Sequence, residues 1–298
     1  MTEIIEILKA ILFGIVEGIT EWLPVSSTGH IILLDEFVRL SVAPNLGSAF
    51  AAEYMSMFEV VIQLGAIMAV VILFFNKLNP FSKKKTAPER KGTWQLWLKV
   101  LIASIPAAFV GIVVDKLLEE LSGKDIDGWI YNFITVAIAL IVYGVLFIVV
   151  EKIQKKRAPK IEAVDGISYK QALMMGGFQM LAIIPGTSRS GSTILGARTL
   201  GISRSAAAEF SFFMGIPAML GASLLKSLGF FSYVIETDVT VPLLAWGVLI
   251  IATAVSLGVS LVTIGFLMNF VKKHNFIPFG IYRIALGVLL IVYYLIKY

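Results

Sequence analysis

Residues 239–271 contain no charged side chain, and this long apolar run constrains the fold more than any other feature of the chain. About 20 apolar residues are enough for a helix to cross the hydrocarbon core of a bilayer. Five further runs meet that requirement, so the sequence predicts an all-α polytopic membrane protein with six transmembrane helices. The six predicted spans are 57–75, 94–114, 129–150, 206–225, 239–271 and 276–296.

The composition supports this class of protein. The chain is 58% hydrophobic and 15% charged, whereas a soluble domain is about half apolar and a quarter charged. A membrane β-barrel would show alternating segments of about ten residues rather than continuous runs. The chain has no cysteine, which excludes disulfides and thiolate chemistry. The net charge of +5 comes from a few basic loops, so membrane lipids are expected partners and nucleic acid is not.

The charged loops alternate in sign along the chain. Residues 76–99 hold seven Lys or Arg against one acid, and 151–170 hold six against three. By contrast, 115–128 and 229–240 are acidic. The positive-inside rule assigns the basic loops to the cytoplasm. With six spans, both termini are then predicted to lie outside.

Two stretches remain outside the predicted spans, at 3–40 and 168–200. Each has apolar arms too short to cross a bilayer, and each is interrupted at a proline, in "LPVSSTG" and "IPGTSRSG". Segments of this length are typical of re-entrant or core helices. We expect two re-entrant hairpins, the first entering from outside and the second from the cytoplasm.

The two halves of the chain resemble each other weakly. Each half is predicted to contain one hairpin followed by three spans. Because three is an odd number, the two halves should have opposite orientations in the membrane, so the sequence predicts a single membrane domain built from inverted repeats at 1–150 and 151–298. The functional site of such a protein usually lies where the two broken helices meet. The matched pairs are Gly14 with Gly176, Glu17 with Gln179, Pro24 with Pro185, Ser27 with Ser188, Glu59 with Glu209 and Gly65 with Gly215.

The first hairpin concentrates polar side chains at its break. Glu17 and Glu21 are four residues apart and share a helix face. After the break, Ser26 or Ser27 can cap the second arm, and His30 shares a face with Ser27. The alternative is that the acids are solvated and the serines only cap. Apolar flanks argue against it, because a charge at the bilayer centre costs about 2.5–3.5 kcal/mol unless it pairs, faces water or binds a cation.

The second hairpin carries "PGTSRSGST" at 185–193. Arg189 offers a planar guanidinium suited to phosphate, and hydroxyls surround it at the start of a helix, which favours anions. This is not a Walker loop, because the Lys-Ser/Thr ending is missing. In the alternative reading, Arg189 only reaches the interface or pairs with a glutamate. The predicted phosphate-binding residues are Ser26, Ser188, Arg189, Ser190 and Thr193.

Other polar residues in the spans are less specific. Glu59 and Gln63 lie four apart in the first span, and Glu209 occupies the matching region of the second half. Polar residues within spans usually face the bundle interior, so all three are candidates to support the site. Arg283 is expected to reach the cytoplasmic surface with its long side chain.

Together the hairpins offer carboxylates, a hydroxyl, an imidazole and a guanidinium, which is equipment for phosphoryl transfer on a lipid phosphate. The chain resembles the bacterial undecaprenyl-diphosphatases of the bacitracin-resistance type. The resemblance rests on "GIVEGITEWLPVSSTGH", "FEVVIQLGAI", "PGTSRSGST", "SRSAAAEFSFFMGIPAMLGA" and "FIPFGIYR", in family order over nearly the whole chain. Extra length relative to typical members falls in 40–56 and the basic loops.

The resemblance implies an enzyme of the bacterial inner (plasma) membrane that converts undecaprenyl diphosphate to undecaprenyl phosphate. Such an enzyme recycles the lipid carrier of peptidoglycan synthesis and confers bacitracin resistance. It also implies a divalent cation, Mg²⁺ or Ca²⁺, and a site that opens to the periplasmic side. The family's acidic motif falls on Glu17 and Glu21, which are the predicted cation ligands, and its hydroxyl–imidazole pair falls on Ser27 and His30.

We expect the diphosphate to lie between the hairpins, with Ser27 as nucleophile, His30 as its base, and Glu17, Glu21 and Arg189 completing the catalytic set. Attack by His30 or by an activated water stays open, and so does a homodimer. A transporter or flippase of the lipid carrier is the main alternative, because paired broken helices are common in transporters. A type-2 phosphatidic acid phosphatase ranks lower, since the chain lacks the second membrane histidine of that family.

Overall fold

The computed structural model of the chain describes residues 2–123, 126–130, 132–155 and 157–297, and over these residues it is helical apart from one isolated bridge between Ile161 and Ile202. Among these residues, six helices are long and apolar enough to cross a membrane. The predicted all-α polytopic class is therefore confirmed. The six are α3 (Gly47–Leu73), α5 (Ala87–Phe109), α8 (Phe133–Gln154), α11 (Arg204–Thr237), α12 (Leu243–Lys273) and α13 (Ile277–Lys297).

Two of these helices are longer than the hydropathy pattern indicates. Helix α3 starts well before residue 57, and α11 continues well past residue 225. The extensions pack on each other, because Phe230 lies edge-on to Phe50 and Tyr54 with ring centroids 5.9 and 6.1 Å apart. Burial of these aromatic rings stabilises helix that a hydropathy window alone does not detect.

Helix α5 changes geometry near its C-terminal end. It contains Pro106, then passes into a π-helical turn at Val110–Val114 (η2) and on into α6 (Asp115–Ser122). A proline removes one backbone donor and crowds the preceding turn, and π-helical turns commonly occur where the regular hydrogen-bond ladder is disturbed. The π-helical turn begins four residues after the proline.

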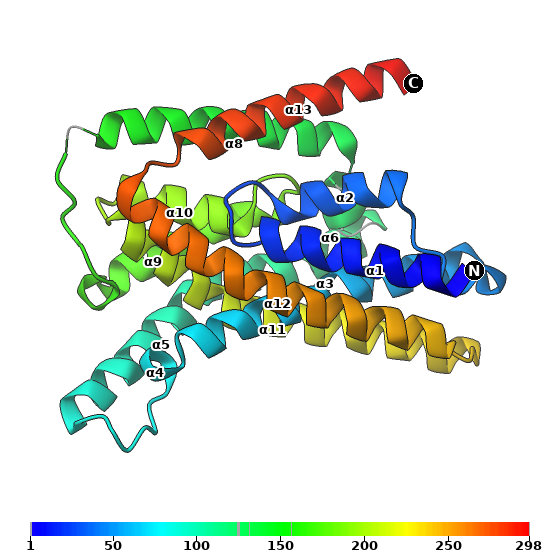
Figure 1. Cartoon of the computed structure of the whole chain (residues 1–298), viewed down its shortest axis with the longest axis horizontal. Coiled ribbons are helices and arrows are strands. Elements are labelled where there is room, and N and C mark those ends of the chain that lie inside the picture. The colour runs from blue at the N-terminus through cyan, green and yellow to red at the C-terminus, as the bar shows by residue number, and fades with distance from the viewer. Residues whose placement is uncertain (1, 124–125, 131, 156, 298) are drawn as a thin grey trace.

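Two shorter helix pairs occupy the stretches predicted as hairpins. The first consists of α1 (Thr2–Thr20) and α2 (Ser27–Phe37), and the second of α9 (Tyr169–Met180) and α10 (Arg189–Thr199). In Figure 1, α2 and α10 lie in the same layer, between the α8–α13 pair and the remaining long helices. The remaining short elements are η1 (Pro44–Leu46), α4 (Phe75–Leu78), α7 (Ile126–Ile130), η3 (Val164–Gly166) and η4 (Leu181–Ile183).

Glycines allow the first arm of each pair to approach a long helix closely. A Cβ atom at Gly14 of α1 would lie 2.5 Å from the carbonyl oxygen of Ala252 in α12. A Cβ at Gly176 of α9 would lie 2.2 Å from the carbonyl oxygen of Ala103 in α5. Small residues at such contacts are typical of helix packing in membranes. Each pair is therefore held by a long helix from the other half of the chain.

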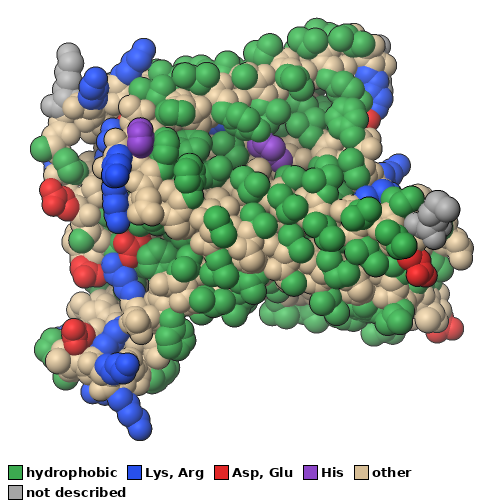
Figure 2. Space-filling model, viewed as in Figure 1, with side chains coloured by type: hydrophobic (Ala, Val, Ile, Leu, Met, Phe, Trp, Pro, Cys, Tyr) green, Lys and Arg blue, Asp and Glu red, His purple; other side chains and the backbone are tan. Residues whose placement is uncertain are grey.

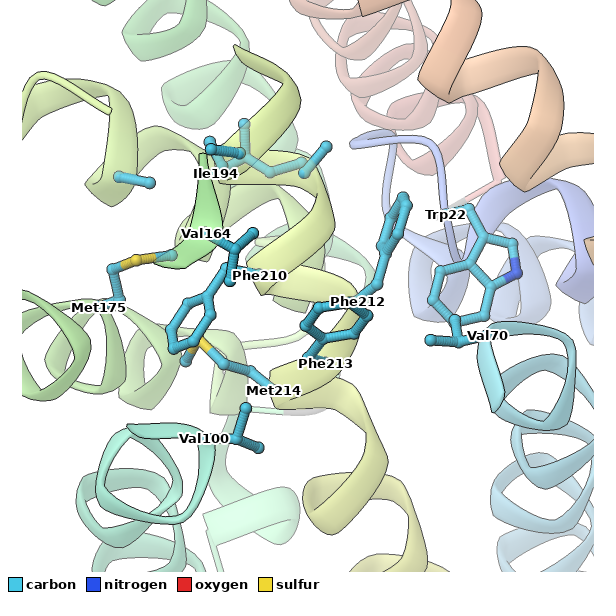
Figure 3. Packing of buried hydrophobic residues seen from close by; sticks show 14 of the residues in the cluster. Trp22, Val70, Val100, Val164, Met175, Ile194, Phe210, Phe212, Phe213 and Met214 are labelled. Atoms are coloured by element: carbon cyan, nitrogen blue, oxygen red, sulfur yellow. The ribbon is translucent and has the colours of Figure 1, made fainter. Parts of the chain in front are cut away.

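The break after α1 is anchored by Trp22. Its side chain is fully buried, and its ring stands edge-on to Phe212 of α11 at 5.1 Å (Figure 3). Figure 2 shows a broad hydrophobic face over the middle of the molecule, with Lys and Arg side chains gathered mainly at one end. The structure therefore has a buried anchor at Trp22, a broad apolar surface on the face shown and a basic end.

Candidate functional site

The two helix pairs turn in the same way. Ser26 and Ser188 precede α2 and α10, with φ angles of 79° and 68°. The Ser26 hydroxyl accepts a hydrogen bond from Gly29 N at 3.2 Å, and the Ser188 hydroxyl accepts one from Gly191 N at 3.1 Å. Left-handed backbone is unusual for serine and is often found at functional sites. The capping residue of the first turn is therefore Ser26, and it corresponds to Ser188, whereas the proline spacing pairs Ser27 with Ser188.

The two turns meet at Glu21. Ser27 Oγ donates a hydrogen bond of 2.6 Å to Glu21 Oε2, and Arg189 Nη2 lies 3.1 Å from Glu21 Oε1. A second donor of Arg189, Nη1, is held by the carbonyl oxygen of Ser211 at 2.7 Å. The side chains of Glu21 and Arg189 are only 6% and 12% exposed. Hydroxyl, carboxylate and guanidinium thus form one buried group across the two hairpins.

His30 is held elsewhere. Its Nδ1 lies 2.7 Å from the carbonyl oxygen of Ser26, and its Nε2 lies 2.6 Å from the Tyr282 hydroxyl. Because a carbonyl can only accept, Nδ1 carries a proton, and in the neutral ring Nε2 accepts from tyrosine. The hydrogen-bond partner of the Ser27 hydroxyl is Glu21 and not the imidazole. This geometry favours Glu21 over His30 as the group that takes the Ser27 proton.

Glu17 lies one turn before Glu21 and is 1% exposed. Its Oε1 is buried and has no hydrogen-bond partner within the described part of the chain. An unpaired buried carboxylate oxygen is costly unless something binds it. Hard divalent cations take oxygen ligands, and Mg²⁺ is often held by one or two carboxylates together with substrate phosphates. The carboxylates of Glu17 and Glu21 fit such a cation, although no group of three or more His, Cys, Asp or Glu among the described residues could hold one unaided.

The remaining hydroxyls of the second turn bind protein atoms. Ser190 Oγ donates to the carbonyl oxygen of Glu21 at 3.0 Å and lies 3.1 Å from Ser188 Oγ. Thr193 is fully buried, and its hydroxyl lies 2.6 Å from Ser211 Oγ. In this structure Ser190 ties the two turns together, and Thr193 fixes α10 to α11.

Arg283 lies at the centre of the molecule, so the expectation that it reaches the cytoplasmic surface is wrong. It is fully buried. Its Nη1 donates to Pro24 O at 3.1 Å, and its Nη2 donates to Gly186 O and Thr187 O at 2.7 and 3.0 Å. One guanidinium from α13 therefore holds the carbonyls of both turns. The position of Arg283 near the start of a helix predicted an exposed side chain, but this part of α13 packs against the two turns.

The three candidate supporting residues lie in different places. Gln63 lines the same cavity as Glu21 and Arg189. Glu59 lines a second cavity, of about 230 Å³, with Asp35 and Glu36. Glu209 forms an ion pair with Lys77 at 2.6 Å and lines neither cavity. Of the three, only Gln63 shares the cavity with the central group.

The cavity at the meeting point has a volume of about 270 Å³. Among its lining residues, Thr28 and Gln179 are polar and were not among the sequence candidates. Gln179 is 3% exposed, and neither polar atom of its amide has a partner among the described residues. The match of Gln179 with Glu17 in the repeat pattern is the sequence signal that could have identified Gln179 as a site residue. The polar lining consists of Glu21, Ser27, Thr28, Gln63, Gln179, Ser188 and Arg189.

These features define a multi-pass membrane protein whose polar site is buried where two broken helix pairs meet. The chain matches the family model of the bacitracin resistance protein BacA over residues 10–289. It is 52% identical to the undecaprenyl-diphosphatase of Enterococcus faecalis, over 96% of this chain and 97% of that protein. The undecaprenyl-diphosphatases of Acetivibrio thermocellus and Streptococcus mutans are 49% and 50% identical, each over 98% of this chain and over 98% and 97% of their own lengths. The protein belongs to the BacA family.

Proposed function

We propose that the protein hydrolyses undecaprenyl diphosphate to undecaprenyl phosphate and inorganic phosphate. The observation that carries the proposal is the contact of Ser27 and Arg189 with the same carboxylate, Glu21. A nucleophile, its base and a phosphate-binding cation are thereby gathered inside a membrane protein. Membership of the BacA family supports the same reaction, and so do relatives named undecaprenyl-diphosphatase that match nearly the full length of the chain.

We propose Ser27 as the nucleophile and Glu21 as its base. As Ser27 Oγ bonds to the terminal phosphorus, its proton passes to Glu21 Oε2. The bond from that phosphorus to the bridging oxygen breaks, and undecaprenyl phosphate leaves with the electron pair. A water molecule then attacks the phosphoserine, inorganic phosphate departs, and Ser27 regains its proton. The 2.6 Å hydrogen bond supports this assignment, because a base must lie within reach of the proton it takes.

Arg189 and the two helix starts would bind the diphosphate. Arg189 Nε is buried without a partner in the described residues, so a donor is available beyond those used by Glu21 and Ser211. Helices α2 and α10 both begin at the meeting point, and free amides at a helix start favour anions. When bound, a divalent cation held by Glu17 and Glu21 would neutralise phosphate charge.

The test is phosphate release from undecaprenyl diphosphate by the purified protein in detergent, with and without EDTA. Transport is impossible without a closed membrane, so release there supports a hydrolase over a flippase. With substrate labelled in the terminal phosphate, acid quenching should leave label on Ser27, because phosphoserine survives acid and phosphohistidine does not. Release without any labelled Ser27 would favour attack by water or His30.

We also propose that the two halves form an inverted repeat and that both helix pairs are re-entrant. Ser26 and Ser188 make matching capping hydrogen bonds, and Gly14 and Gly176 each pack against a long helix of the other half. Both observations support a pseudo-two-fold relation between the halves. The start of α1 and the end of α13 lie at the same end of the molecule, away from the main group of Lys and Arg (Figures 1 and 2).

That arrangement supports termini outside and a site serving the periplasmic face. Labelling of single cysteines placed near each terminus and in the 76–99 loop, with an impermeable reagent on intact cells, tests it. The terminal cysteines should react and the loop cysteine should not. A homodimer stays a prediction.

A further inference from the structure

The cavity at the meeting point has a second, apolar wall. Besides the polar residues, the cavity is lined by four alanines from three elements and by Met219, Ile183 and Ile184. We call this surface the alanine wall; it comprises Ala107 of α5, Ala182 next to Leu181 in η4, and Ala218 and Ala222 of α11. A cavity serving inorganic phosphate alone would need no such surface, since phosphate is bound by polar groups.

The alanine wall reaches the outside of the molecule. Ala222 is exposed, and Ile184 is 39% exposed although both line the cavity. Exposed apolar residues lie close to them in the sequence, with Leu181, Leu220 and Leu224 being 42%, 51% and 61% exposed, and the charged Lys226 is exposed one turn after Ala222. The cavity therefore continues to a mainly apolar surface between η4 and α11.

This opening lies at the depth of the hydrocarbon core. Ala107 is near the middle of the continuous span 87–122, and Ala218 and Ala222 are near the middle of the span 204–237. An entrance for a water-soluble ligand would be expected at helix ends, whereas an opening halfway along two spanning helices faces lipid tails. An apolar chain suits this position better than a water-soluble ligand.

Both helices that line this part of the cavity carry a proline there. Pro106 precedes Ala107 in α5, and Pro217 precedes Ala218 in α11. Each proline removes a helix hydrogen bond and disturbs the preceding turn. An alanine directly after each proline keeps the side-chain volume low at these two lining positions.

Building on the proposed function, we infer that the alanine wall binds the first isoprene units of the substrate and that the prenyl chain leaves laterally into the bilayer between α5, α11 and η4. About 270 Å³ is below the roughly 300–1,000 Å³ of pockets that enclose a drug-sized ligand, so the undecaprenyl chain must extend out of the cavity. The polar lining holds the diphosphate, and the alanine wall makes the site selective for a diphosphate that carries a prenyl chain.

The kinetic test compares Ala107→Leu with its neighbour Ala108→Leu, which is exposed and does not line the cavity. Ala107→Leu should raise KM for undecaprenyl diphosphate about tenfold and change KM for methyl diphosphate, which has no isoprene unit, less than about threefold. Ala108→Leu should change neither by more than about threefold. Ala222→Leu, at an exposed position, repeats the test without a folding risk. Unchanged KM for the long substrate, or equal losses on both substrates, would overturn the inference.

A binding measurement separates this inference from the proposed hydrolysis. Undecaprenyl phosphate carrying a diazirine on an isoprene unit near the phosphate is photolysed with the wild-type protein in detergent, and the adducts are mapped by mass spectrometry. Adducts are expected within 105–112 and 218–225. Adducts confined to other helices would contradict the lateral path even if phosphate release is normal. Adducts in these segments without phosphate release would contradict the hydrolase and retain the path.

Discussion

Glu21 accepts a hydrogen bond from Ser27 on one carboxylate oxygen and pairs with Arg189 through the other, at 2.6 and 3.1 Å. The first hairpin thus supplies the hydroxyl and the carboxylate that accepts its hydrogen bond, and the second supplies the guanidinium. Replacing the carboxylate by an amide keeps the shape of this group and removes its negative charge. We expect Glu21→Gln to lower kcat by about 10²–10⁴-fold, the range typical of a lost general base.

The measurement is steady-state phosphate release by the purified variant. Glu36→Gln is the matched control, because Glu36 bonds Lys297 and Tyr293 and does not line the site cavity. The control should keep wild-type turnover. A Glu21→Gln protein with more than about a tenth of wild-type kcat would rule out Glu21 as the base.

Gly215 of α11 leaves room for the Arg189 side chain. A Cβ atom at this position would lie 2.9 Å from the guanidinium carbon of Arg189, so an alanine must displace it. A displacement of about an ångström in a positioned catalytic group can cost about 100-fold in rate. We expect Gly215→Ala to lower kcat/KM by about ten- to 100-fold with little change in the unfolding temperature.

Gly221 provides the comparison within the same helix. A Cβ atom there has nothing within 4 Å, so Gly221→Ala should leave kcat/KM unchanged and slightly favour the helix. Equal activity of the two variants would show that the position of Arg189 tolerates the extra methyl group.

Much of the fold follows from one-dimensional patterns. A span needs only apolar length, so the six long helices could be located before the structure was known. Proline and serine mark the breaks of the hairpins for local reasons, and the prediction that Ser26 or Ser27 caps the second arm is confirmed at Ser26. Local rules did not distinguish the two serines, because the choice depends on the positive φ of Ser26.

The contacts that complete the site depend on tertiary structure. His30 meets Tyr282, and Arg283 meets the turns at Pro24 and Gly186, all between segments far apart in the sequence. Spacing indicated that His30 shares a face with Ser27, but the turn directs the Ser27 hydroxyl to Glu21. No local pattern reports which distant carbonyl or hydroxyl a side chain will reach, so these partners could not be predicted.

The unpaired carboxylate oxygen of Glu17 leads to a prediction about cation dependence. Removal of divalent cations with EDTA should abolish phosphate release, and added Mg²⁺ or Ca²⁺ should restore it. Glu17→Gln keeps the volume but loses one anionic ligand, so the cation concentration for half-maximal activity should rise about tenfold or more. Gln179→Glu adds a carboxylate to the cavity that Glu21 lines and is expected to lower that concentration in the Glu17→Gln background.

Titration of activity against free Mg²⁺ measures both effects. The unfolding temperature of each variant, recorded in parallel, separates cation binding from folding. A Glu17→Gln protein with the wild-type cation requirement would show that Glu17 is not a ligand.

Arg283 determines how the two turns are held relative to each other. Its donors satisfy three buried carbonyls, and its guanidinium carbon lies 5.4 Å from the centre of the Tyr143 ring. Arg283→Met fills similar volume but leaves those carbonyls unpaired, at about 1–3 kcal/mol for each. We expect a loss of several kcal/mol in the free energy of unfolding, and reduced turnover even at temperatures where the variant stays folded, because the Glu21–Arg189 contact joins the same turns.

Thermal unfolding in detergent and phosphate release well below the midpoint measure the two effects of Arg283. Arg283→Lys keeps the charge but not the planar fork that reaches both turns, so it should recover part of the stability and less of the activity. Arg39→Met, at an exposed arginine, controls for loss of a positive charge and should change neither quantity. Wild-type midpoint and turnover in Arg283→Met would mean that the turns hold their geometry through Ser190 and the Glu21–Arg189 pair alone.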